Sequence, residues 1–237
     1  MIKLTQQLQI ALLCLVAMAS SAQSSEVKDP DPYESFNRKS HSFNETLDKY
    51  IARPAAKIYT STLPDPVEKR VVNFFSNLDE LTNIMNDLLQ AKFGQAANDT
   101  GRFLINSTLG IGGLFDVAER AGLPKSEGED FGQTLGAWGI GEGPYLMLPL
   151  VGPSTLRDAP SKYIDSFANP VSHLEDASAR NSIRLVGLVS ARAELLGLDD
   201  AISGDSYLFV RDVYLQRRDY LVKDGAIEDD FGDLDDY

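Results

Sequence analysis

The chain contains few of the side chains from which catalytic and metal sites are usually built. Its 237 residues include one cysteine, Cys14, and two histidines, His41 and His173. So few thiol and imidazole groups, without clustered spacing, argue against a zinc site. The Gly-x-Ser-x-Gly turn of serine lipases is also missing, and the glycines at 110–113 are not followed by the lysine-serine or lysine-threonine pair of a phosphate-binding loop. These absences disfavour a metal site and an enzymatic reaction.

Basic residues are scarce as well. The chain has 22 lysines and arginines against 35 aspartates and glutamates, a formal net charge of -13. Proteins that bind nucleic acids need basic side chains for the phosphates, so we expect no nucleic-acid partner. Residues 224–237 contain seven acids and no lysine or arginine. We predict an acidic tail over residues 223–237, which is either disordered in solvent or acts as a docking peptide.

An apolar segment between Pro144 and Pro153 is too short for a transmembrane helix, which needs about twenty apolar residues. A proline at each end and a third, Pro149, between them argue against a core helix and fit a strand poorly. We predict a kinked apolar hairpin, which is either buried in a core or exposed to a membrane interface.

The first 22 residues have the features of an export signal peptide. A basic residue precedes a short apolar stretch, which ends in small residues. The signal is either cleaved near Ala22 or lipidated at Cys14. A lipidation signal has a small residue before the cysteine, and Leu13 stands there, which favours cleavage.

Residues 33–222 are predicted to form one helical domain, after a polar linker at residues 23–32. The first helix starts at Tyr33 and ends or bends at Arg53-Pro54. Periodicity and capping residues then predict helices at residues 55–62, 66–89, 95–107, 179–198 and 207–222, with Asp65 and Asp205 as caps. Loop residues dominate positions 124–143, and no run of alternating strand residues is present, so the fold class is all-α.

Apolar stripes run along three of these helices, and in a soluble domain such a stripe faces the core. In the first helix the expected stripe contains Phe36, Phe43, Leu47 and Tyr50. In the helix after Asp65 it contains Val67, Val71, Phe74, Leu78, Leu81, Met85 and Leu88. In the helix at 179–198 it contains Ile183, Val186, Leu188, Val189, Ala193 and Leu196.

Five long blocks between residues 31 and 221, in order and without large gaps, resemble the MlaA family, also called VacJ. They are DPYESFNRKSHSFNETLDKYIARPAAKIY (31–59), VVNFFSNLDE (71–80), GRFLINSTLGIGGLFDVA (101–118), EDFGQTLGAWGIGEGPYLMLPLVGPSTLRDAP (129–160) and YLFVRDVYLQRRDYL (207–221).

The resemblance implies a ring of amphipathic helices around a central amphipathic channel, with the Gly/Pro-rich apolar hairpin in or near its wall. Members of that family lie in the periplasmic leaflet of the outer membrane of Gram-negative bacteria. They remove mislocalised phospholipids from the outer leaflet and pass them to a periplasmic lipid-carrier protein, which maintains lipid asymmetry. They associate with trimeric porins, bind no cofactor and catalyse no covalent reaction. A soluble periplasmic protein-binding module and a phospholipase are the alternative functions.

A lipid passage needs an apolar wall for acyl chains and polar or cationic contacts for the headgroup phosphate. Candidates for the wall are Gly110, Gly112, Gly113, Tyr145, Leu146, Leu148 and Val151. Arg157 and Arg211 are candidates for the headgroup side, or each pairs with its neighbour, Asp158 or Asp212. Phe43 and Asn44 belong to the N-terminal helix, which we expect to regulate lipid movement.

Overall fold

The computed structural model of the chain describes residues 30–201 and 204–226. Helices dominate these residues, and two short strands form a hairpin. The predicted signal peptide with Cys14, the linker up to residue 29 and the tail beyond residue 226 lie outside the described residues.

The first three helical segments form one arm that bends at a proline. α2 (Glu34–Leu47) leads through a π-helical turn, η1 (Asp48–Ala52), into α3 (Arg53–Thr62). Pro54 has no N–H to donate, and its ring would clash with the carbonyl four residues back in a regular α-helix. The π turn widens the helix at this point, and the N–H of Arg53 donates to the carbonyl oxygen of Asp48, five residues back. The predicted break at Arg53-Pro54 is therefore a bend.

α4 (Asp65–Leu89) and α5 (Phe93–Thr108) pack along each other as a helical hairpin. Pro64 occupies the N-cap of α4 and no side chain caps that helix, so the predicted Asp65 cap is wrong. Pro66 lies in the first turn, where a missing N–H costs nothing. A turn at residues 109–116 leads to the short helix α6 (Val117–Arg120), which Asp116 caps.

A short helix and a β-hairpin follow. α7 (Phe131–Ala137) lies where we expected only loop, because the Asp130 carboxylate accepts a hydrogen bond from the backbone N–H of Gln133 and starts a helix despite the nearby glycines. β1 (Tyr145–Leu148) and β2 (Gly152–Thr155) pair antiparallel, with Tyr145 opposite Thr155 and Leu148 opposite Gly152. The hairpin predicted between Pro144 and Pro153 is confirmed.

The C-terminal part is helical. It consists of α8 (Asp158–Ala168), the 3₁₀ turn η2 (Pro170–His173), α9 (Ala177–Glu194), the 3₁₀ turn η3 (Leu196–Ala201) and α10 (Ser206–Val222). The predicted cap of α10 is confirmed, because the Asp205 carboxylate accepts from the N–H of Tyr207 at 3.0 Å.

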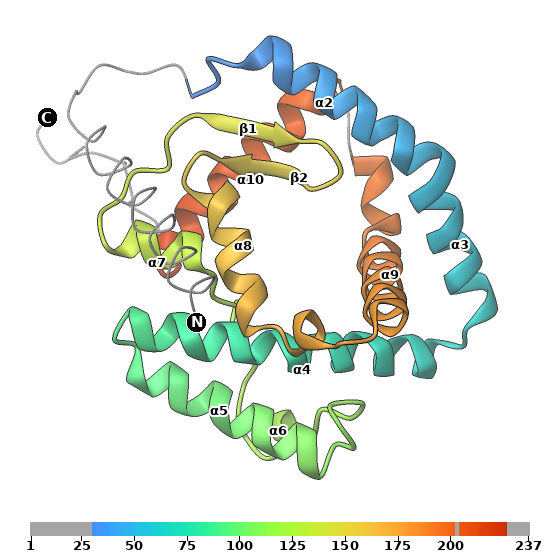
Figure 1. Cartoon of the computed structure of the whole chain (residues 1–237), viewed down its shortest axis with the longest axis vertical. Helices are drawn as coiled ribbons and strands as arrows, with labels where there is room; N and C mark the ends of the chain where they lie inside the picture. The colour runs from blue at the N-terminus through green and yellow to red at the C-terminus, as the bar shows by residue number, and fades with distance from the viewer. Residues whose placement is uncertain (1–29, 202–203, 227–237) are drawn as a thin grey trace, which may run out of the picture.

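Contacts between elements follow a closed order (Figure 1). α2 packs on β1 and continues through η1 into α3; α3 packs on α9, α9 on α4, α4 on α8, and α8 on β2, which pairs with β1. α5 and α6 lie on the side of α4 away from the hairpin (Figure 1). Within residues 30–201 and 204–226, no helix is both long and apolar enough to cross a membrane.

Polar side chains outnumber apolar ones at the buried positions. Among the described residues, nine buried side chains are apolar and 20 are polar or charged. Along α2 and η1 the aromatic side chains Phe36, Phe43 and Tyr50 are 52%, 49% and 70% exposed, whereas Asn37 and His41 of α2 are buried. The aromatic stripe of the first helix is therefore exposed and does not face a core.

α4 and α9 depart from a soluble-core pattern at some positions, although most residues of their apolar stripes are half-buried. The buried residues of α4 are Asn77, Glu80, Asn86 and Asp87. Val67 and Leu88, from the predicted inward stripe, are exposed, and so are Val186 and Leu188 of α9. The stripes failed as predictors of burial at these exposed positions. An amphipathic pattern shows that two faces of a helix differ in polarity, and it does not show which face the protein buries.

Ion pairs and a small aromatic cluster fill the interior. Nε of Arg102 lies 2.8 Å from Oε1 of Glu80, and both side chains are 2% exposed. Nη2 of Arg102 lies 2.9 Å from Oδ2 of Asp116. Beneath the hairpin, Tyr145 and Met147 pack with Tyr207 of α10. Buried charges are tolerated when they are paired, so this interior depends on polar geometry more than on apolar volume.

Candidate functional site

A pocket of about 640 Å³ lies between α2, η1, the hairpin, α9, η3 and α10. Its charged and polar lining includes His41, Asn44, Glu45, Asp48, Arg53, Arg192, Asp199 and Ser206. Its apolar lining includes Met147, Pro153 and Val210. The wall of the pocket is therefore amphipathic.

Charged side chains form one side of this pocket. Arg192 of α9 donates to both carboxylate oxygens of Asp48, at 2.5 and 3.1 Å, and to both oxygens of Asp199, at 2.8 and 3.0 Å. Nη2 of Arg53 lies 3.0 Å from Asp48. The hydrogen bond from Arg192 holds the pKa of Asp48 below its ordinary value, although partial burial opposes this. The network ties the π turn to the end of α9.

A second polar group lines the pocket beside α10. Nε2 of His41 lies 3.0 Å from Oγ of Ser206, and that hydroxyl donates its hydrogen to Oε1 of Glu45 at 2.7 Å. A hydroxyl has one hydrogen, so Nε2 of His41 carries a hydrogen of its own and donates it to Ser206. These contacts join α2 to the start of α10.

Two asparagines of α2 hold the hairpin against the pocket. The amide of Asn37 donates to the carbonyl oxygen of Tyr145 at 3.0 Å and accepts from the N–H of Met147 at 2.8 Å. The amide of Asn44 donates to the carbonyl oxygen of Leu148 at 3.0 Å and accepts from the N–H of Leu150 at 2.8 Å. Each side-chain amide thus makes the pair of hydrogen bonds to the hairpin backbone that a neighbouring strand would otherwise make. Through them, α2 holds both β1 and the turn that follows it.

Comparison with known proteins identifies the family. The sequence pattern of the MlaA lipoprotein family matches residues 29–221. The intermembrane phospholipid transport system lipoprotein MlaA of Escherichia coli (strain K12) is 36% identical over 96% of this chain and 96% of its own. This chain belongs to the MlaA lipoprotein family. The resemblance found in the sequence blocks is confirmed.

Other relatives extend the match. A protein of Rickettsia felis (strain ATCC VR-1525 / URRWXCal2) is 39% identical over 81% of this chain and 78% of its own. A solved structure reported as the structural basis for maintenance of bacterial outer membrane lipid asymmetry superposes with a TM-score of 0.72 at 38% identity. That match covers 81% of this chain and 98% of the other.

The wall residues that we expected in this MlaA family member lie on both faces of the hairpin. Tyr145 is fully buried in the aromatic cluster with Tyr207, and burial raises the pKa of its hydroxyl. Leu146 and Leu148 alternate with the buried residues and are half-buried, and Val151 is exposed at the turn. Met147, Gly152 and Pro153 are the hairpin residues that line the pocket. The role of the hairpin as a channel wall stays a prediction.

The glycine turn expected in the channel wall lies elsewhere. Gly110, Gly112 and Gly113 follow α5, on the side of α4 away from the hairpin (Figure 1). Gly112 and Gly113 have φ of 68° and 90°, a region that favours glycine. A Cβ on Gly113 would also lie 2.5 Å from Cβ of Asn77, so this turn is pressed closely against α4.

The two arginines expected at the headgroup side are engaged in ion pairs. Arg157 is buried, and its Nε donates to Oδ1 of Asp158 at 2.8 Å. Nε of Arg211 donates to Oδ1 of Asp212 at 2.8 Å. Neither arginine lines the pocket, whereas Arg53 and Arg192 do.

Sequence reasoning did not single out Asn37, Asp48 or Arg192. The spacing of Asn37 and Asn44, two asparagines seven residues apart on one helical face, was the signal that could have identified the hairpin contacts. Asp48 and Arg192 are 144 residues apart, and nothing in the spacing indicates that they meet.

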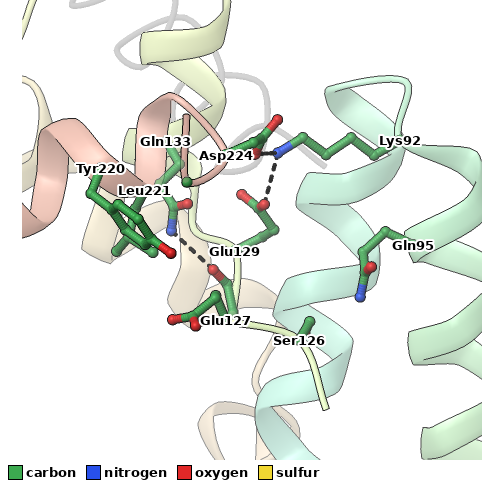
Figure 2. A pocket seen from close by; sticks show the side chains of 11 residues that line it. Lys92, Gln95, Ser126, Glu127, Glu129, Gln133, Tyr220, Leu221 and Asp224 are labelled. Atoms are coloured by element: carbon green, nitrogen blue, oxygen red, sulfur yellow. Dashed lines mark hydrogen bonds and ion pairs between the residues drawn. The ribbon is translucent and has the colours of Figure 1, made fainter. Parts of the chain in front are cut away.

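A smaller pocket of about 290 Å³ lies between the start of α5, residues 126–129, α7 and the end of α10 (Figure 2). Nζ of Lys92 lies 2.8 Å from Oε1 of Glu129 and also contacts Asp224. Nε2 of Gln133 donates to the carbonyl oxygen of Gly128 at 3.2 Å. These bonds join the α4–α5 turn to the end of α10, which favours a structural role for this pocket.

Proposed function

We propose that this chain carries out intermembrane phospholipid transport and thereby maintains the lipid asymmetry of a bacterial outer membrane. The observation that carries this proposal is the similarity to E. coli MlaA along nearly the full length of both chains. Phospholipids are moved intact in this function, so the protein works without covalent chemistry.

Exposed apolar side chains support a location in the membrane. α2, α3, α5 and α9 expose Phe36, Phe43, Ile58, Leu104, Leu185 and Leu188, among others. Soluble monomers rarely expose apolar patches of more than a few hundred Å². Amphipathic helices with such faces suit a membrane interface, and the location that we propose is the periplasmic leaflet of the outer membrane, reached after export through the signal peptide.

The closed order of contacts from α2 through α3, α9, α4, α8 and the hairpin supports a ring. In this proposal the outer faces of the ring contact acyl chains, and its centre is an amphipathic channel. The pocket described above belongs to the channel. Met147 and Val210 offer an apolar surface to acyl chains, and Lys49, whose Nζ lies 5.5 Å from the centre of the Tyr50 ring, offers positive charge to the phosphate.

Transfer of an acyl chain into water costs about 0.8 kcal/mol for each methylene that becomes exposed. A phospholipid therefore cannot cross the periplasm unaided, and this scheme requires a periplasmic carrier protein. The family resemblance also implies a trimeric porin as the neighbour in the membrane. The competing function, a soluble helical binding module, is disfavoured by the apolar side chains that α2, α3 and α9 expose.

Inactivation of the gene in its own bacterium tests the proposal. We expect more phospholipid at the cell surface and restoration of asymmetry by the wild-type chain. The same extracts should contain intact diacyl phospholipid. Unchanged surface phospholipid would contradict transport, and loss of lysophospholipid upon inactivation would favour a phospholipase.

A further inference from the structure

The pocket between α2, the hairpin and α10 is called the transport pocket below. Another pocket, of about 480 Å³, lies at the far side of α4 from it. Lys69, Arg70 and Asn73 of α4, the turn after α5 and helix α6 line it. It shares no lining residue with the pocket between α2 and α10. The turn at residues 109–116, which contains the three glycines and does not line the transport pocket, therefore borders a separate pocket.

Three basic side chains of this pocket have no ion-pair partner within residues 30–201 and 204–226: Lys69, Arg70 and Arg120. Of the two acids in the lining, Asp116 is already paired with Arg102, at 2.9 Å. Glu119 is the other acid, so the pocket keeps an excess of positive charge in a chain of net charge -13. Such an excess favours an anionic ligand.

Large apolar side chains border the same cations. Leu109 and Ile111 are 71% and 65% exposed, and Phe115 is 41% exposed. The guanidinium carbon of Arg70 lies 4.2 Å from the centre of the Phe115 ring, which fixes its position by a cation–π contact. The amide of Asn73 donates to the carbonyl oxygen of Leu114 at 3.2 Å and holds the turn on α4. Cationic and exposed apolar side chains thus lie side by side, on a surface whose parts are held in place by these contacts.

We propose that this pocket binds the phosphate of an anionic phospholipid of the surrounding leaflet, with the acyl chains lying over Leu109 and Ile111. The inference rests on the proposed location in the membrane and adds a lipid contact separate from the transport pocket. In a bilayer the phosphates lie directly above the acyl chains, which matches cations that border exposed apolar side chains. Lipid bound at this site holds the α4–α5 end of the molecule level with the headgroup layer of the membrane.

Flotation of the purified full chain with lipid vesicles tests the site. Phosphatidylcholine vesicles are compared with vesicles of equal parts phosphatidylcholine and phosphatidylglycerol, at low and high salt. The test variant carries Lys69→Gln, Arg70→Gln and Arg120→Gln. The control carries Lys39→Gln, Lys57→Gln and Lys125→Gln, which remove the same charge from exposed positions outside the pocket.

The wild type and the control should bind the anionic vesicles more tightly than the neutral ones. The test variant should lose about fivefold in that preference for each basic side chain removed, with neutral binding and circular dichroism unchanged. An equal loss in the control would show general charge attraction and overturn the proposal. A preference that survives in the test variant, while its binding of polyglutamate is lost, would assign the pocket to an acidic protein. Binding to neither vesicle by the wild type would contradict the proposed membrane location as well.

Discussion

Arg102 lies between two carboxylates, 2.8 Å from Glu80 and 2.9 Å from Asp116, with 2% of its side chain exposed. Replacement by methionine keeps most of the volume but leaves the buried Glu80 without a cation. We expect Arg102→Met to lower the free energy of unfolding by about 3–5 kcal/mol, the usual cost of breaking a buried pair. Denaturant unfolding in detergent, followed by circular dichroism, measures this.

The control for Arg102→Met is Arg217→Met, because Arg217 is 62% exposed and lies 3.9 Å from Glu127. That change should cost less than about 1 kcal/mol. Adding Glu80→Gln to Arg102→Met should recover part of the loss, since residue 80 then no longer carries an unpaired buried charge. A single variant as stable as the wild type would show that the ion pair does not hold α4 to α5.

Asp87 and Asp99 are fully buried carboxyl groups on facing helices. Asp99 accepts hydrogen bonds from the side chains of Gln95, Asn98 and Ser126, whereas the oxygens of Asp87 have no donor among the described residues. Burial and the negative charge of Asp99 raise the pKa of Asp87 to about 7. Asp87 is therefore largely protonated below neutral pH.

The raised pKa of Asp87 predicts a fall in stability with pH. The folded chain binds more protons than the unfolded chain between the ordinary pKa of 3.8 and about 7. The stabilisation is complete below that window and is lost as pH rises through it, by about 1 kcal/mol per pH unit. Asp87→Asn should make this fall less steep, and Asp65→Asn, at the exposed start of α4, should leave it unchanged. Parallel profiles for wild type and Asp87→Asn would refute this assignment.

At the scale of elements, the contact between α2 and the hairpin gives Phe43 and Asn44 a physical role. Deletion of both residues rotates the two parts of the arm relative to each other by about 200°, because each helical residue turns about 100°. After this rotation, the contact of Asn37 with β1 and the contact of Asp48 with Arg192 can no longer form at the same time. We expect misregulated lipid movement with normal protein abundance, measured as phospholipid at the cell surface.

Asn44→Ala separates the hairpin contact from the helical rotation. It removes the acceptor for the N–H of Leu150 and should speed hydrogen exchange there, with a milder effect on surface phospholipid. Ser35→Ala, at an exposed position of α2 outside the pocket, serves as the control. Normal surface phospholipid in the two-residue deletion would exclude this helix from the mechanism.

Local signals in the sequence predicted most elements but not all their details. The Asp205 cap, the hairpin between three prolines and the helix after Lys92 depend on neighbouring residues, and each was found within a few positions. α7 was missed because glycines obscured a helix that one capping carboxylate starts. The transport pocket could not be derived, because Asp48 and Arg192 meet only when α3 packs on α9.

At the scale of the whole molecule, the exposed apolar faces and buried polar residues should make the protein sensitive to charge on its outside. Leu188 of α9 is 70% exposed. In a soluble protein Leu188→Lys would change stability by within about 0.5 kcal/mol. In contact with acyl chains it should cost about 2–3 kcal/mol at full depth and reduce the outer-membrane fraction of the protein. Ser182→Lys, at another exposed position of α9, is the comparison, and equal membrane fractions for both would argue against lipid contact at Leu188.

The most direct test of transport through the pocket between α2, the hairpin and α9 is photocrosslinking in cells. A photoreactive amino acid at Val210 or Thr46 reports on the pocket, at Ile58 on the exposed outer face, and at Ala118 on the buried α5–α6 contact. We predict crosslinks to phospholipid from Val210, Thr46 and Ile58 and none from Ala118. Crosslinks to phospholipid from Ile58 but not from either pocket position, in a protein that still restores asymmetry, would contradict a lipid path through this pocket.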